Sequence, residues 1–156
     1  MTPSLRRIRP VTDRGSPGHR RSGAARRQEG RGATGSRTGR GVYLGRAGED
    51  AAVKHLEGLG FRVVERNYRN RLGEIDAIAV EGETLCFVEV KARRVGAYGS
   101  GLDAVESKKR GRVRRAAAAY LARFGPSPPA CRFDVVEVWL DSKGRPERVR
   151  LLRNAF

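Results

Sequence analysis

The stretch Gly73–Lys91, with the sequence GEIDAIAVEGETLCFVEVK, decides the fold. Two apolar runs, residues 75–80 and 84–90, are separated by a short polar segment around Gly82. This pattern is typical of a β-hairpin. If Gly82-Glu83 forms a two-residue turn, the pairing of the two strands is fixed, because turn length sets the register of a hairpin.

Three charged residues interrupt the apolar runs on one face of this predicted hairpin. Side chains alternate along a strand, so Glu89 and Lys91 share a face. With the turn at Gly82-Glu83, Asp76 in the first strand lies directly opposite Glu89. The sequence therefore predicts two carboxylates and an ammonium group at one end of a largely apolar hairpin.

Such a cluster has a chemical use. Two close carboxylates repel each other unless a cation lies between them, and hard oxygen ligands suit Mg²⁺ or Mn²⁺. A neighbouring lysine would orient a water molecule and neutralise charge that builds on a phosphate. A surface hairpin with a cross-strand ion pair accounts for the same spacing equally well.

Asp76, followed by Glu89-Val90-Lys91, resembles the PD-(D/E)xK nuclease signature, with Ile75 in place of the proline that names it. The strings NYRNRLGEIDAIA, FVEVKARR and RFDVVEV are similar to the YraN family, a group of uncharacterised bacterial proteins. The resemblance runs from about Leu44 to the C-terminus. It implies a restriction-endonuclease-like fold, similar to that of archaeal Holliday-junction resolvases.

The resemblance also implies a set of site residues. Asp76, Glu89 and Lys91 take the catalytic positions, and the two carboxylates bind Mg²⁺ or Mn²⁺. Glu49, in GRAGEDAA, matches a helical glutamate that joins the metal site in the resembled nucleases. The main-chain carbonyl of Val90, which lies between two site residues, is a further candidate ligand.

The remaining elements follow from periodicity and punctuation. Residues 44–59 predict a helix that ends at Gly60, because apolar residues recur there at three- and four-residue spacing. Glu49 leans toward the buried side of this helix, although an acid near a helix N-terminus is also favoured by the helix dipole. Further elements are predicted as a strand at 61–64, a helix at 103–124, and strands at 132–140 and 147–152. With the hairpin, this order favours an α/β sandwich with a mixed central sheet of about five strands.

The chain has 156 residues and a formal net charge of +16 at pH 7. Residues 1–40 carry eleven arginines against two acidic residues, have seven glycines and lack aromatic residues. Such a composition cannot bury enough apolar surface to order itself, so residues 1–41 are predicted to be a disordered basic tail and residues 42–156 the folded domain. An Arg-rich, acid-poor N-terminus also resembles a transit peptide. Another explanation is a mis-assigned start codon, with the real protein beginning near Val42.

The positive charge favours an anionic partner. The residues expected to contact a nucleic-acid backbone lie before the hairpin and in the second helix: Arg69, Arg71, Lys108, Lys109 and Arg112. The same residues also fit a solvated helix face and a protected sheet edge. Resemblance to junction resolvases implies DNA rather than RNA, and a homodimer, because two cuts across a junction need two sites.

No run of the sequence approaches the length of a membrane span, and no signal-peptide hydrophobic region precedes the domain, so we expect a cytoplasmic protein without a membrane partner. The leading hypothesis is a metal-dependent nuclease-like protein acting on phosphodiester bonds, with branched DNA as a candidate substrate. The alternative is a non-catalytic nucleic-acid-binding module on the same fold.

Overall fold

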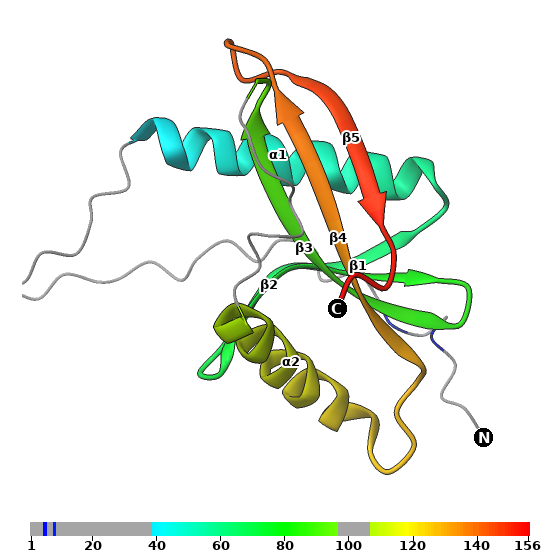
Figure 1. Cartoon of the computed structure of the whole chain (residues 1–156). Coiled ribbons are helices and arrows are strands. Elements are labelled where there is room, and N and C mark those ends of the chain that lie inside the picture. Colours follow the sequence, from blue (N-terminus) through cyan, green and yellow to red (C-terminus); the bar gives the residue numbers. More distant parts are fainter. Residues whose placement is uncertain (1–4, 6–7, 9–38, 97–106) are drawn as a thin grey trace, which may run out of the picture.

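The computed structural model describes residues 5, 8, 39–96 and 107–156 (Figure 1). The elements follow the predicted order of helix, three strands, helix and two strands. They are α1 (Gly39–Gly58), β1 (Arg62–Asn70), β2 (Gly73–Glu81), β3 (Thr84–Arg94), α2 (Ser107–Leu121), the short 3₁₀ helix η2 (Ala122–Phe124), β4 (Cys131–Leu140) and β5 (Pro146–Leu152).

The described strands form one five-stranded sheet in the order β1-β2-β3-β4-β5. Neighbouring strands are antiparallel except for β3 and β4, which are parallel. A parallel pair needs a long crossover connection, and the segment that contains α2 provides it. The prediction of an α/β sandwich with a mixed five-stranded sheet is confirmed.

The two helices cover opposite faces of the sheet (Figure 1). On one face, Val113, Ala116, Ala117 and Tyr120 of α2 pack in one apolar cluster with Ile78 and Phe87. These α2 residues recur at helical spacing. On the other face, Ala51, Ala52 and Leu56 of α1 pack with Ala77, Val88 and Val136. Alternation along residues 77–80 of β2 and 85–88 of β3 therefore divides the core into two layers.

The central hairpin has the predicted register. Glu81 pairs with Thr84 and Ala77 pairs with Val88, so the turn consists of Gly82 and Glu83. Gly82 has φ of 59°, a conformation that glycine adopts without steric cost. Asp76 and Glu89 are the next residues along the two strands beyond the Ala77–Val88 pair.

The end of α1 is defined by Gly60, as predicted. The amide of Phe61 donates to the carbonyl of Leu56 at 3.0 Å, and Gly60 has φ of 86°. This is the Schellman arrangement, in which a left-handed residue ends the helix and the following amide satisfies a free carbonyl. Leu56 and Phe61 are also both buried in the apolar cluster beneath α1. This motif ends α1, and β1 begins directly after it at Arg62.

Some expectations differ from the structure or lie outside it. β1 is longer than the predicted strand at 61–64, because the arginine-rich segment that follows also pairs with β2. The predicted start of the second helix, at Asp103, lies outside the described residues. Most of the predicted tail, residues 1–41, is also outside them. However, Leu5 is only 5% exposed, so the expectation of disorder does not extend to it. No described helix is long and apolar enough to cross a membrane.

The glycines at the end of α1 provide a stability test. Gly60→Ala should lower the free energy of unfolding by about 1–2 kcal/mol, because alanine is strained at this positive φ. Gly58→Ala is the matched control, since Gly58 ends the helix with open space around its Cα. It should leave stability unchanged or raise it by about 0.5 kcal/mol. Urea denaturation of both variants measures the difference, and equal effects would contradict the capping role of Gly60.

Candidate functional site

The site is built around the apposition of Asp76 and Glu89 on the face of the sheet that α2 covers. Asp76 Oδ2 accepts a hydrogen bond from the backbone amide of Val90 at 2.7 Å, which holds the carboxylate against β3. Burial, followed by the charge of Glu89, raises the pKa of Asp76 from 3.8 to about 6. A carboxyl group with this pKa is one whose charged form lacks a sufficient cation nearby.

Glu89 is the buried member of the pair, with 2% of its side chain exposed. Its Oε1 accepts hydrogen bonds from the ammonium groups of Lys91, at 3.0 Å, and Lys109. Lys91 lies two residues further along β3, whereas Lys109 comes from the first turns of α2. The structure thus brings Asp76, Glu89 and Lys91 together and adds a second lysine.

The two lysines differ in their proton affinity. Burial lowers the pKa of Lys91, and the charge of Glu89 only partly offsets this effect. Burial also acts to lower the pKa of Lys109, but the hydrogen bond to Glu89 and its charge outweigh burial, so this pKa is raised. Lys109 therefore keeps its proton, and its positive charge, more strongly than Lys91 does.

Glu49 reaches the edge of this cluster from α1. Asn67 donates a hydrogen bond to Glu49 Oε2 at 3.3 Å, and the charge of Glu49 contributes weakly to the raised pKa of Asp76. Within the described part of the chain, no group of three or more His, Cys, Asp or Glu side chains is close enough to hold a metal ion. The roles of Glu49 and of the Val90 carbonyl as ligands remain predictions.

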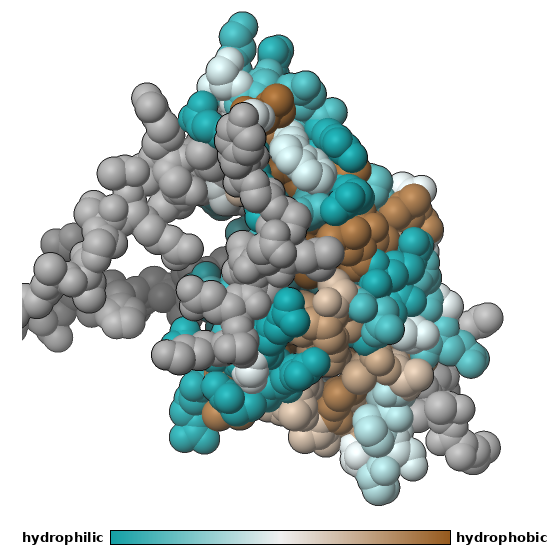
Figure 2. All heavy atoms as spheres, viewed as in Figure 1, coloured by the Kyte–Doolittle hydropathy of each residue, from teal (hydrophilic) through white to brown (hydrophobic). Residues whose placement is uncertain are grey.

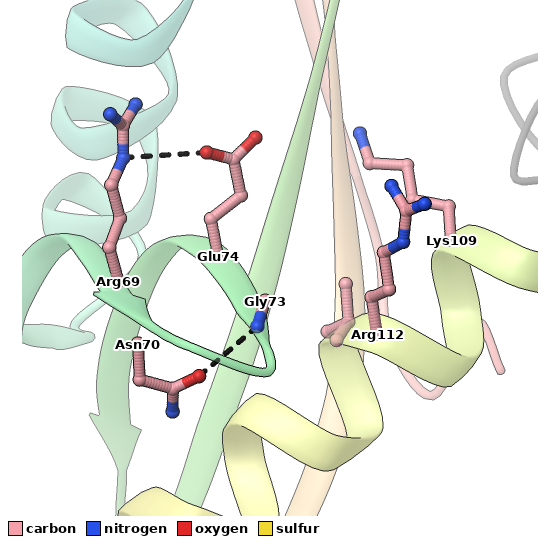
Figure 3. A pocket seen from close by; sticks show the side chains of 7 residues that line it. Arg69, Asn70, Gly73, Glu74, Lys109 and Arg112 are labelled. Carbon is pink, nitrogen blue, oxygen red and sulfur yellow. Dashed lines mark hydrogen bonds and ion pairs between the residues drawn. The ribbon is translucent and has the colours of Figure 1, made fainter.

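A pocket of about 440 Å³ adjoins the cluster, between the turn that connects β1 to β2 and the first half of α2. Figure 3 shows Lys109 and Arg112 on the α2 side of it and Arg69 and Glu74 on the strand side. Arg69 and Glu74 form an exposed ion pair at 3.4 Å. Three cationic side chains face one carboxylate, so the lining is net positive. Because Lys109 also contacts Glu89, the pocket and the carboxylate pair share a residue.

The wall of the pocket depends on a close approach of backbone to backbone. A Cβ on Gly73 would lie 2.6 Å from the carbonyl oxygen of Arg112, so only glycine fits there. Asn70 closes the adjoining turn by accepting hydrogen bonds from the amides of Leu72, at 2.8 Å, and Gly73, at 3.1 Å. The turn is thereby held against α2.

The five residues expected to bind nucleic acid have different positions. Arg69, Lys109 and Arg112 line the pocket, Arg71 is exposed on the β1–β2 turn, and the side chain of Lys108 lies outside the described residues. Figure 2 shows hydrophilic side chains gathered over the first half of α2 and this turn. These basic residues therefore border the carboxylate cluster on one surface.

Sequence reasoning named Lys109 without its contact to Glu89, and it missed Glu137. It treated Lys109 as a surface contact, yet Lys109 precedes Val113 by four positions and Ala116 by seven, which places it on the buried stripe of α2. Glu137 in β4 is 1% exposed, is the register partner of Lys91, and pairs with Arg150 at 2.7 Å. A glutamate inside the apolar run VVEVWL was the available signal for it.

Comparisons with known proteins concern most of the domain. Residues 48–138 match the family described as Uncharacterised protein family UPF0102. A UPF0102 protein of Symbiobacterium thermophilum is 52% identical over 113 residues, which cover 72% of this chain and 95% of the relative. UPF0102 proteins of Moorella thermoacetica and a Parafrankia species are 46% and 49% identical, over 72% of this chain and 93% and 95% of the relatives.

The raised pKa of Asp76 predicts a pH-dependent stability. Its folded-state pKa of about 6 exceeds the ordinary 3.8, so the native state binds this proton more tightly than the unfolded chain does. The stability that this group contributes is therefore fully present below about pH 4 and is lost as pH rises to about 6. Asp76→Asn should exceed the parent in free energy of unfolding by on the order of 2 kcal/mol at pH 7.5 and converge with it near pH 4.

Urea denaturation with a chelator present, repeated across pH, measures this difference. Asp50→Asn is the matched control, because Asp50 is 62% exposed and pairs with Arg66 at the surface. That variant should follow the parent at every pH. A stability difference for Asp76→Asn that does not vary with pH would contradict the assignment.

Proposed function

The chain belongs to the uncharacterised protein family UPF0102, and from this premise we propose that it is a metal-dependent nuclease-like protein of the restriction-endonuclease-like fold. Its substrate would be the phosphodiester backbone of a nucleic acid. The observation that carries the proposal is the shared position of Lys109, which contacts Glu89 and also lines the cationic pocket. A phosphate in that pocket would lie beside the two carboxylates.

The donor set suits a hard divalent cation. Asp76 and Glu89 provide adjacent carboxylate oxygens. Burial, followed by the charge of Glu89, raises the pKa of Asp76, and a bound cation would offset both effects. We expect these two residues to hold Mg²⁺ or Mn²⁺. Glu49 and the main-chain carbonyl of Val90 are further candidate ligands. When bound, such an ion supplies charge stabilisation at phosphorus and a more acidic water molecule.

The protein's own side chains would then divide the work. Lys91, whose pKa is lowered by burial and which contacts Glu89, would orient a water molecule beside the carboxylates. Lys109, Arg112 and Arg69 would bind the phosphate backbone, since guanidinium and ammonium groups form strong hydrogen bonds to phosphate oxygens. A phosphate in the pocket would also compete with Glu89 for Lys109.

A non-catalytic nucleic-acid-binding module is the second candidate. One observation favours it: Lys91 and Lys109 both contact Glu89, so two cationic side chains of the chain itself already pair with this carboxylate. A protein of this kind would bind through its basic surface, with affinity that falls steeply as salt rises. DNA is the preferred partner for both candidates, and a homodimer is the proposed assembly.

Cleavage assays separate the two candidates. Purified protein with Mg²⁺ or Mn²⁺ should nick DNA among single-stranded, duplex, flap and four-way substrates, and chelation should abolish the activity. Asp76→Asn should lose both cleavage and Mn²⁺ binding, measured by calorimetric titration, because it removes a ligand. Asp50→Asn should retain both. Mn²⁺ binding to neither the parent nor Asp50→Asn, together with DNA binding by all three proteins, would favour the binding module.

Lys91→Ala should separate metal binding from chemistry. Mn²⁺ affinity should stay the same or rise slightly, because a nearby positive charge is removed. Cleavage should fall by roughly a hundredfold or more, since water orientation and charge neutralisation are lost together. Single-turnover cleavage and calorimetry on the same preparation provide the two readouts. Cleavage equal to that of the parent would reduce Lys91 to a structural partner of Glu89.

Neighbouring lysines in α2 test whether the pocket is specific. Lys109→Ala and Lys108→Ala each remove one positive charge from the same turn of the helix. If the pocket binds phosphate, Lys109→Ala should weaken DNA binding roughly three- to tenfold more than Lys108→Ala at about 0.1 M salt. Fluorescence anisotropy on a labelled duplex measures both affinities. Equal losses would mean that only overall charge matters.

A further inference from the structure

Two residues near the N-terminus, Leu5 and Ile8, contact the folded domain. Leu5 is 5% exposed and belongs to the apolar cluster beneath α2, together with Val64, Val80 and Leu85. Ile8 packs against the same cluster. Apolar side chains in an otherwise Arg- and Gly-rich segment are thus placed in the core of the domain.

Arg62, the first residue of β1, binds the backbone of the same segment. Its Nη1 donates to the carbonyl of Ile8 and its Nη2 donates to the carbonyl of Leu5, each at 2.5 Å. The amide of Ile8 donates to the Leu5 carbonyl at 3.3 Å. A guanidinium group fits this task, because its planar fork presents two donors to two acceptors at once.

The strand register places the apolar contacts of Leu5 and the hydrogen bonds of Arg62 next to each other on the sheet. Arg62 pairs with Val80 across β1 and β2, and Val80 pairs with Leu85 across β2 and β3. Val80, the partner of Arg62, and Val64, which lies where the register of β1 shifts, both pack in the cluster on the face that α2 covers. The guanidinium therefore lies at the edge of the apolar surface that Leu5 covers. This spot is at the turn end of the central hairpin, away from Asp76 and Glu89.

We propose that Leu5 and Ile8 form a docking motif, which binds an apolar site at the start of β1 and is clamped there by Arg62. The occupant is this chain's own N-terminal segment. Residues 9–38, which carry eight arginines and two acidic residues, then connect a bound segment to the start of α1. The motif would keep this basic segment attached to the domain at both of its ends. The proposal does not depend on nuclease activity.

Hydrogen exchange and thermal melting on the full chain test the docking. Leu5→Ser should lower Tm by several degrees and speed exchange of the Ile8 amide by roughly ten- to a hundredfold, because the anchoring side chain no longer favours burial. Leu59→Ser is the matched control, since Leu59 is 46% exposed. It should change neither quantity. Equal Tm values for the two variants, with unprotected Ile8 in the parent, would overturn the proposal.

The clamp gives a second variant in case Leu5→Ser folds poorly. Arg62→Ala should release the segment and speed Ile8 exchange, while Arg62→Lys should give an intermediate effect, because lysine lacks the fork. Arg66→Ala, which removes a surface arginine paired with Asp50, is the control and should leave Ile8 protected. Unchanged Ile8 protection in Arg62→Ala would contradict the clamp.

A synthetic peptide of residues 1–12 tests the site directly. It should bind full-length Leu5→Ser, whose site is vacated, and bind the parent weakly, because the parent's site is occupied. The same peptide with serine at position 5 should bind neither. Ile8 protection that falls on dilution of the parent would show that a second copy supplies the segment, and this result would overturn the intrachain assignment.

Discussion

A carboxylate removed from water stays charged only if cations reach it, and Glu89 imposes this requirement on the whole structure. The strand register fixes Asp76 opposite it, which adds a second negative charge rather than a cation. Relief comes from Lys91 on the same strand and Lys109 on α2. The position of α2 across the sheet is therefore an electrostatic necessity as well as a packing result. The close approach of Gly73 to Arg112 allows the helix to lie near enough.

The other end of the central hairpin is held by a separate set of ion pairs. Arg132 contacts Asp134 through its Nε at 3.0 Å and also contacts Glu81 beside the turn. Asp134 is fully buried and accepts a hydrogen bond from the amide of Asn154 at 2.8 Å. These contacts join β2, β4 and the C-terminal segment, so Asp134 has structural contacts. By fixing where β4 starts against β3, they also fix Glu137 opposite Lys91.

Local patterns predicted the parts of the molecule that depend on local rules. A two-residue turn at Gly82-Glu83 was sufficient to place Asp76 opposite Glu89, because alternation along two paired strands leaves no freedom. Three- and four-residue spacing of apolar residues likewise predicted the first helix and its end at Gly60. The contact between Lys109 and Glu89 joins residues twenty positions apart across a crossover, and no periodicity encodes how far a helix slides along a sheet. Leu5 was missed for another reason: composition averages over a segment, while docking depends on single side chains.

The two lysines on Glu89 are not interchangeable, and their difference bears on the function proposed for this site. Lys91 lies on a strand, and burial lowers its pKa, so its ammonium group loses its proton more easily than that of Lys109. Lys109 is on a helix, its side chain is 41% exposed, and its charge is reinforced by Glu89. A phosphate entering the pocket can attract Lys109 without moving the backbone, because a long side chain changes rotamer easily. Glu89 would then keep only Lys91 as its cationic partner, which increases its affinity for a divalent cation. In this arrangement, substrate and metal ion would each favour the binding of the other, because both act through the single carboxylate of Glu89.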